Sequence, residues 1–314
     1  MKKIYQISLF ALLAATMSGI TACTAEQPET DSATGNKRPV TLNIGTRAAA
    51  GSAAEWMDGD QVRIASADAP LEAITLGCTV ATSADGVATY TWNNIEPGGN
   101  NYLMADKTDR FAAYYPVTTD ANLTAFALPK LPNGTIDQST DALLHAADYM
   151  TVSSVAATDN RLNLALEHRL CRVTITISGY SSEFAGTSLT FSDDARIASP
   201  ADGVSVAYAT GTGAATVTPS GSAVSVKPLV VTDASGQGLH SFTAIVTPGT
   251  YAAGTALLTF TLNGLPMRVD LAATTTLTAG TAYAYTLEVA AKELTLTLQP
   301  SGLPGWNENN ETQL

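Results

Sequence analysis

Apolar and polar residues alternate over many short stretches of this chain beyond about residue 38. In RVTITIS (172–178) the β-branched apolar residues fall on one side, and the Thr and Ser residues fall on the other. The same period of two runs through LTFTL (258–262), AYAYTLEV (282–289) and ELTLTLQ (293–299). Such alternation is typical of a β-strand with one face on a core and one face in water. The pattern therefore predicts a protein built mainly of strands.

Turn signals separate these stretches. Asn263-Gly264 lies between two alternating runs, and both residue types tolerate the positive φ of a tight hairpin turn. Further loops are expected at EPGGNN (96–101), PADG (200–203) and TPGT (247–250). The sequence contains no convincing long amphipathic helix, and TDALLHAADYM (140–150) fits either a short helical turn or an irregular loop.

Short strands at intervals of about ten residues favour antiparallel β-sandwiches. The part of the chain with this pattern is long enough for two sandwiches, which we favour over one oversized sheet. ISGYSSEFAG (177–186) interrupts the alternation and marks the boundary. We therefore expect an all-β protein with two antiparallel β-sandwich domains in tandem, residues 39–182 and 183–314.

The N-terminal segment has the features of an export signal. Lys2 and Lys3 precede an apolar run from Ile4 to Ile20. Ile-Thr-Ala-Cys at 20–23 resembles the lipobox of bacterial lipoproteins, in which cleavage before the Cys is followed by attachment of acyl chains such as palmitate. We therefore predict a lipoprotein signal peptide at 1–22, lipidation of Cys23 and an acidic flexible leash at 23–38. The alternative is an ordinary cleaved signal peptide that contains a Cys.

Composition narrows the possible partners. Charged residues make up 14% of the chain, and the formal net charge is −12. Binding to nucleic acid needs clusters of Lys and Arg, so we expect no nucleic-acid partner.

Cys78 and Cys171 lie in strand-like sequence and fit either a disulfide, which export permits, or two free buried thiols, which we prefer. Neither has a His or a second Cys at metal-ligand spacing, so we predict no metal site.

Candidate catalytic groups are sparse. His145, His168 and His240 stand outside any recognisable nucleophile motif, and no metalloprotease, Walker or dinucleotide-binding fingerprint occurs. The acidic pairs in DGDQ (58–61) and SDD (192–194) are typical of turns and lack the spaced oxygen ligands of a calcium loop. We therefore predict a protein that is not an enzyme and that uses no cofactor.

A series of short motifs resembles the fimbrillins of Bacteroidales type V pili, the Mfa-like and FimA-like lipoproteins. No single motif is specific, but their order along nearly the whole chain matches the family. After Cys23 they are LNIGTRA (42–48), W-x-x-GDQVRIAS (56–66), FAAYYP (111–116), STDALLHA (139–146), LEHRLCRVTITI (166–177), LTAGTAYAYTLEV (277–289), KELTLTL (292–298) and Trp306.

The resemblance implies two transthyretin-like sandwiches and a structural, adhesive role at the outer membrane or in a fimbrium. It also implies cleavage after Arg47, at the bond to Ala48, which frees the strand-like VTLNI (40–44) and opens a groove for a strand of another fimbrillin subunit. Main-chain hydrogen bonds and alternate side chains make such donor-strand complementation possible. The alternative is that Arg47 is an ordinary exposed loop residue.

One departure bears on the position in a pilus. Stalk subunits of the family carry C-terminal donor strands, whereas here only the polar LPGWNENNETQL (303–314) follows the last clear strand. A tip subunit, an anchor subunit and a surface lipoprotein that never polymerises therefore stay open, and a host or microbial surface ligand is expected for a tip.

A surface carbohydrate-binding lipoprotein of a glycan-uptake system is the alternative function, and it requires Trp56, Trp92 and Trp306 exposed together. A hydrolase requires an acidic pair that faces a pocket.

Overall fold

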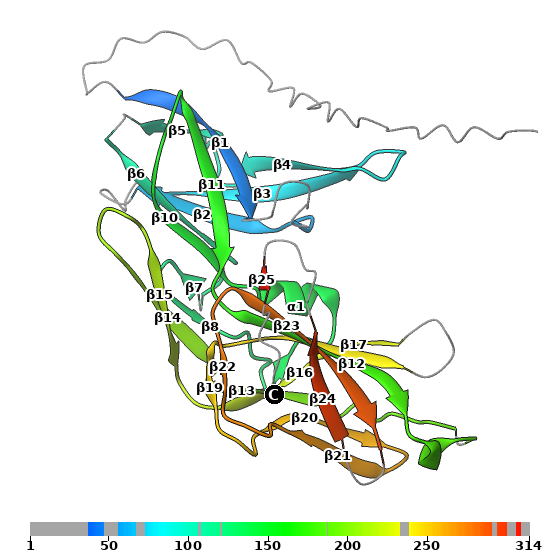
Figure 1. The fold of residues 1–314 in the computed structure, drawn as a ribbon. Coiled ribbons are helices and arrows are strands. Elements are labelled where there is room, and N and C mark those ends of the chain that lie inside the picture. The colour runs from blue at the N-terminus through cyan, green and yellow to red at the C-terminus, as the bar shows by residue number, and fades with distance from the viewer. Residues whose placement is uncertain are drawn as a thin grey trace, which may run out of the picture. The chain divides into compact units, whose positions relative to one another are not determined.

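The computed structural model describes residues 37–46, 56–66, 73–105, 108–119, 121–186, 188–232, 239–290, 294–299 and 306–308. Strands dominate these residues, which confirms the all-β prediction (Figure 1). The helical segments within these ranges are α1 (Asp141–Ala146) and a 3-10 helix (Ser182–Phe184). In this part of the chain no helix is long and apolar enough to cross a membrane.

Helix α1 settles the two interpretations of the 140–150 segment in favour of a short helical turn. Thr140 precedes the helix with extended backbone, and its hydroxyl accepts a hydrogen bond from the Leu143 N–H at 3.2 Å. A threonine in this position satisfies one of the N–H groups that the first turn leaves without a partner. Leu144 is the residue of α1 that is buried.

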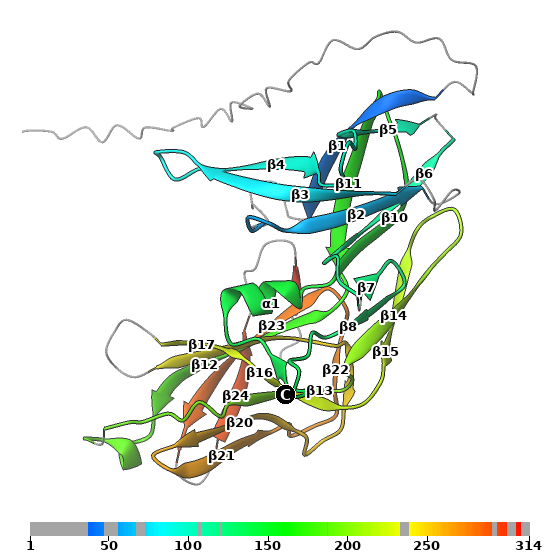
Figure 2. The same cartoon turned by 180° about the vertical axis from the view of Figure 1, so that it is seen from behind.

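The first sheet has eight strands and contains most of the N-terminal half of the described chain. Its β3–β4 hairpin extends beyond the neighbouring strands of the same sheet in both views (Figures 1 and 2). In spatial order the strands are β4 (Ala88–Asn94), β3 (Ala73–Thr82), β2 (Gln61–Ser66), β6 (Arg110–Tyr115), β10 (Met150–Ala156), β11 (Arg161–His168), β1 (Arg38–Thr46) and β5 (Tyr102–Ala105).

The second sheet has six strands, and its centre is a parallel pair formed by β12 and β23. Its strands are β17 (Leu229–Thr232), β18 (His240–Val246), β12 (Cys171–Tyr180), β23 (Thr281–Val289) and β24 (Leu294–Gln299), with β25 (Asn307–Glu308) paired to the start of β23.

Three smaller sheets contain the remaining strands of the described residues. The five-stranded sheet runs β21 (Leu265–Asp270), β20 (Ala256–Leu262), β13 (Arg196–Ser199), β16 (Val224–Lys227) and β9 (Ile136–Asp137). The four-stranded sheet runs β15 (Ala215–Ser220), β14 (Gly203–Tyr208), β8 (Ala125–Ala127) and β7 (Ala121–Asn122), and a two-stranded sheet joins β19 (Gly249–Tyr251) to β22 (Thr275–Leu277).

The predicted hairpin at Asn263-Gly264 is confirmed. Strands β20 and β21 pair antiparallel, with Leu262 opposite Leu265. Asn263 has φ of 52° and Gly264 has φ of 77°, as a two-residue turn with two left-handed positions requires.

The buried apolar side chains form two clusters within the compact unit at 36–314. The first cluster lies on the eight-stranded sheet, from Val40 to Leu166. The second takes side chains from 121–149 and again from Leu170 to Val289, because the chain leaves the first sheet after β6 and returns at β10. The chain therefore crosses between the clusters more than once. The division into domains at residue 182 stays a prediction.

Candidate functional site: strand β1 and its groove

Strand β1 lies inside the eight-stranded sheet rather than at its edge. It pairs parallel with β11 and antiparallel with β5, the strand that ends the sheet on that side. The alternation of the sequence is preserved: Val40 and Ile44 are 2% and 9% exposed, whereas Thr41 and Asn43 face outward and are exposed. Residues 38–46 thus form a strand because one side meets the core and the other meets water.

The groove that holds β1 has leucine walls. On one side Leu103 of β5 is directly opposite Val40, and on the other side Leu164 of β11 is the partner of Ile44. Both leucines are almost fully buried in the first cluster. Burial of a Val or Ile side chain stabilises a fold by about 1.5–3 kcal/mol. Without β1, the groove would expose this apolar slot and the unpaired main-chain groups of β11 and β5.

One side-chain contact and one main-chain hydrogen bond hold β1 in register with β11 and the residue that precedes it. The Asn43 amide donates to the side-chain oxygen of Asn163 at 3.1 Å, and the Thr41 N–H donates to the Asn160 carbonyl at 2.8 Å. A shift by one residue would turn every apolar side chain of β1 to the solvent. The groove therefore accepts a strand in one register.

Arg47, Ala48 and Cys23, the predicted processing and lipidation residues, lie outside the described residues. Strand β1 ends at Thr46, immediately before Arg47, and the description resumes at Trp56. Trp56 is 6% exposed and packs edge-to-face on Trp92, with ring centroids 5.0 Å apart. The segment 47–55 therefore connects the end of β1 to Trp56, whose side chain packs in the first cluster.

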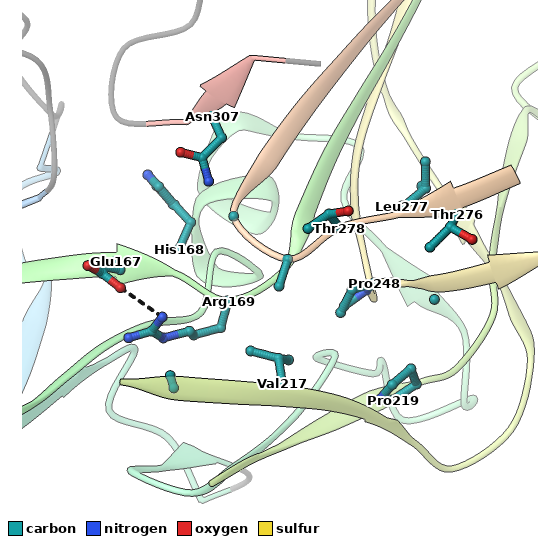
Figure 3. A pocket seen from close by; sticks show the side chains of 14 residues that line it. Glu167, His168, Arg169, Val217, Pro219, Pro248, Thr276, Leu277, Thr278 and Asn307 are labelled. Atoms are coloured by element: carbon teal, nitrogen blue, oxygen red, sulfur yellow. Dashed lines mark hydrogen bonds and ion pairs between the residues drawn. The ribbon is translucent and has the colours of Figure 1, made fainter. Parts of the chain in front are cut away.

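A cavity of about 510 Å³ lies at the junction of β11 and β12 (Figure 3). At one end the Arg169 guanidinium donates through Nη1 to Glu167 Oε2 at 2.9 Å and through Nε to Thr151 Oγ1 at 2.7 Å. Val217 and Leu277 supply apolar walls. The lining therefore combines this ion pair with apolar side chains, and it also includes His168.

The sequence matches the model of the fimbrillin-like family over residues 46–301. The chain belongs to this family. No protein of curated function matches the fimbrillin-like chain in sequence.

Solved structures share the fold of the fimbrillin-like chain. A candidate cell adhesion protein from Bacteroides uniformis is 22% identical, with a TM-score of 0.53 over 84% of this chain and 96% of that one. A second candidate cell adhesion protein, from Bacteroides ovatus, is 14% identical, with a TM-score of 0.51 over 83% of this chain and 95% of that one. At these identities the similarity shows a common fold.

The acidic pairs of the fimbrillin-like chain lie in or beside turns, as the sequence predicted, and they contact strands far away in the sequence. Asp58 accepts the Val80 N–H at 3.0 Å, and Asp194 accepts the Thr261 N–H at 3.1 Å. Asp193 pairs with the Lys227 ammonium at 2.7 Å. Within the described ranges no group of three or more His, Cys, Asp or Glu residues is placed to hold a metal ion.

Each histidine of the fimbrillin-like chain has a structural neighbour. His145 Nε2 lies 2.7 Å from Asp60 Oδ2 and His168 Nδ1 lies 2.8 Å from Asp148 Oδ1. The ring of His168 also stacks on Trp306, and the ring of His240 stacks on Phe191, each at 3.9 Å between centroids. His145 and His168 are thus each paired with an aspartate, and the rings of His168 and His240 each stack on an aromatic side chain.

The three Trp residues do not form one exposed platform. Trp56 and Trp92 pack in the first cluster, and Trp56 is buried. Trp306 is partly buried against the second cluster. The arrangement that a carbohydrate-binding surface required is therefore absent from these three side chains.

Cys78 and Cys171 are free and buried, in different clusters. Burial raises the pKa of Cys78 to about 11, with a further contribution from the charges of Asp60 and Asp58. Burial alone raises the pKa of Cys171, whose Sγ–H donates to the Thr278 carbonyl at 3.1 Å. Both thiols therefore act as small apolar groups.

Sequence reasoning did not identify the walls of the groove. RLNLALEH (161–168) alternates as clearly as VTLNI, with Leu162, Leu164 and Leu166 on one side, so the strand could have been found. Its partner could not, because the parallel pairing joins residues 120 positions apart.

Proposed function

We propose that this fimbrillin-like chain is a non-enzymatic pilus subunit or adhesin of the cell surface, anchored to the outer membrane through lipid on Cys23. In this proposal, cleavage of the Arg47–Ala48 bond frees β1, and a strand from another fimbrillin subunit then fills the groove between β11 and β5. The place of β1 carries the proposal: the strand lies between two others and ends one residue before Arg47.

The chemistry of the groove describes the partner strand. The positions of Val40, Leu42 and Ile44 face the core, so the incoming strand needs three apolar residues at alternate positions. Its outward positions are polar, as Thr41 and Asn43 are now. Main-chain hydrogen bonds to β11 and β5 would supply affinity that does not depend on sequence, and the three apolar positions would supply specificity.

The contacts of the C-terminal strands support a terminal position in a pilus, as a tip or an anchor. Strand β25 pairs with the start of β23, and the Asn307 N–H donates to the Gly280 carbonyl at 2.9 Å. Trp306 stacks on His168. These contacts hold residues 306–308 on their own chain rather than offering them to a neighbour. A tip subunit would also contact a host or microbial surface ligand.

Limited trypsin digestion tests the proposal. We expect an early cut after Arg47 in the Cys23→Ser chain, read by intact mass, and no cut there in the matched Arg47→Gln variant. After removal of the N-terminal fragment, a synthetic peptide with residues 38–46 should bind the cut chain. The same peptide with Ser at positions 40 and 44 should not, because it lacks the two buried side chains.

Two outcomes would overturn the proposal. The first is an initial cut after Arg63 or Arg161 with Arg47 left intact. The second is equal binding of the two peptides, which would show that the groove does not discriminate between apolar and polar side chains at positions 40 and 44.

A further inference from the structure

A partly buried His–Asp pair joins helix α1 to the segment that precedes β2. His145 Nε2 lies 2.7 Å from Asp60 Oδ2, and the two side chains are 21% and 10% exposed. Leu144, next to His145, packs in the second hydrophobic cluster, whereas Trp56 and Tyr115, near Asp60, pack in the first. The pair therefore connects two clusters that have separate cores.

The Asp60 carboxylate lies within hydrogen-bonding distance of three groups. Besides His145, its carboxylate accepts the Tyr115 hydroxyl at 3.0 Å and the Met57 N–H at 2.7 Å. The Tyr115 ring also lies beside the imidazole, with centroids 5.4 Å apart. A carboxylate with several donors in a buried place has a fixed position. Asp60 thus holds α1, β6 and the residue after Trp56 together.

The charge of His145 is set by the groups around it. Burial lowers the pKa of His145, but the hydrogen bond and charge of Asp60, together with the charge of Asp148, outweigh burial and the opposing charge of Arg172. The net effect raises the pKa of the imidazole above its ordinary value. The stabilisation from the charged pair is therefore complete below the ordinary pKa of histidine, about 6.5, and is lost as the pH rises through the raised value.

We propose that His145 acts as a proton-dependent latch between the two hydrophobic clusters. In its charged form the imidazole makes an ion pair with Asp60 and holds α1 against the first cluster. In its neutral form the attraction to Asp60 is weaker, so the contact between the two clusters is weaker as well. The second His–Asp pair, His168 with Asp148, lies at the same junction, at the end of β11. Arg169 also lies at this junction, where it pairs with Glu167 at 2.9 Å and donates to Thr151 Oγ1 at 2.7 Å. This inference does not depend on cleavage at Arg47 or on strand exchange.

A histidine titration of the full mature chain, followed by NMR, measures the latch directly. We expect the His145 ring signals to titrate with a pKa above that of an unfolded histidine, and we expect Asp60→Asn to bring it down. Because Asn keeps an acceptor and a similar shape but carries no charge, this variant separates the charge from the packing. A wild-type pKa at or below the unfolded value would overturn the proposal.

Hydrogen exchange tests the mechanical consequence. With intrinsic rates removed, amides in 56–61 and 141–147 should be better protected near pH 5.5 than near pH 8, because only the charged imidazole makes the full ion pair with Asp60. His145→Gln should abolish this difference. His240→Gln, which alters a ring stacked on Phe191, should keep it. An unchanged pH dependence in His145→Gln would refute the latch.

Discussion

Replacement of Ile44 by Ala tests how much the buried side chains of β1 contribute to the unfolding free energy. Ile44 is 9% exposed and lies in register with Leu164 of β11. The substitution removes three carbon groups from the core, at about 0.8 kcal/mol for each buried group. A cavity is left against Leu164, so the total loss of unfolding free energy should be about 2–4 kcal/mol.

Urea unfolding gives the measurement, and Thr41→Ala is the matched control. Thr41 is on the same strand but faces outward, so its loss should cost under about 0.5 kcal/mol. A double-mutant cycle with Leu164→Ala should show a coupling of about 0.5–3 kcal/mol, because the two side chains lie in register. If Ile44→Ala were no more destabilising than Thr41→Ala, the buried face of β1 would contribute little and the argument for the groove would fail.

Three further predictions concern parts of the chain away from the groove. Cys78 and Cys171 should resist alkylation in the native chain near pH 8 and react after unfolding, because burial raises the pKa of both thiols; mass spectrometry gives the measurement. Gly264→Ala should lower the unfolding free energy by about 1 kcal/mol, since Gly264 has φ of 77° and the added methyl group has open space around it. Lys130→Met should raise the pKa of Asp202, which is now lowered chiefly by the Lys130 hydrogen bond at 2.6 Å, as an NMR titration would show.

Each of these predictions has a result that contradicts it. Rapid native alkylation of either Cys would mean that its strand opens readily. A neutral Gly264→Ala would mean that the turn does not need its left-handed residue. The Lys130–Asp202 pair is partly exposed, so it should contribute under about 1 kcal/mol. That contribution is present above the ordinary carboxyl pKa and is lost as the pH falls through the lowered value, so greater acid stability of Lys130→Met would contradict the assignment.

The alternation of the sequence predicted individual strands well, because the period of a strand is a local property. The stretches at 172–178, 258–262 and 282–289, and residues 294–299 of the fourth, lie in strands of the structure. The Asn263-Gly264 turn was equally local. The pairing of strands, in contrast, is not a local property. Strands β6 and β10 are neighbours in one sheet, although β7, β8, β9 and α1 lie between them in the chain.

The candidate site was predicted only in part for the same reason. VTLNI was identified as a strand, but nothing in those five residues indicates that its partners are β11 and β5. The placement of the three Trp residues also depended on tertiary packing, which buries Trp56 against Tyr115 and leaves Trp306 on His168. These long-range contacts do not bring the three side chains together as the carbohydrate-binding alternative required.

The parallel pairing of β1 with β11 has a consequence for the order of folding. Asn43 and its partner Asn163 are 120 positions apart, so pairing β1 with β11 closes a long loop of chain. Contacts of such high order form late, after local hairpins such as β2–β3 and β3–β4. Strand β1 should therefore be among the last strands to join its sheet, and until it joins, the apolar slot between β11 and β5 stays open to another strand.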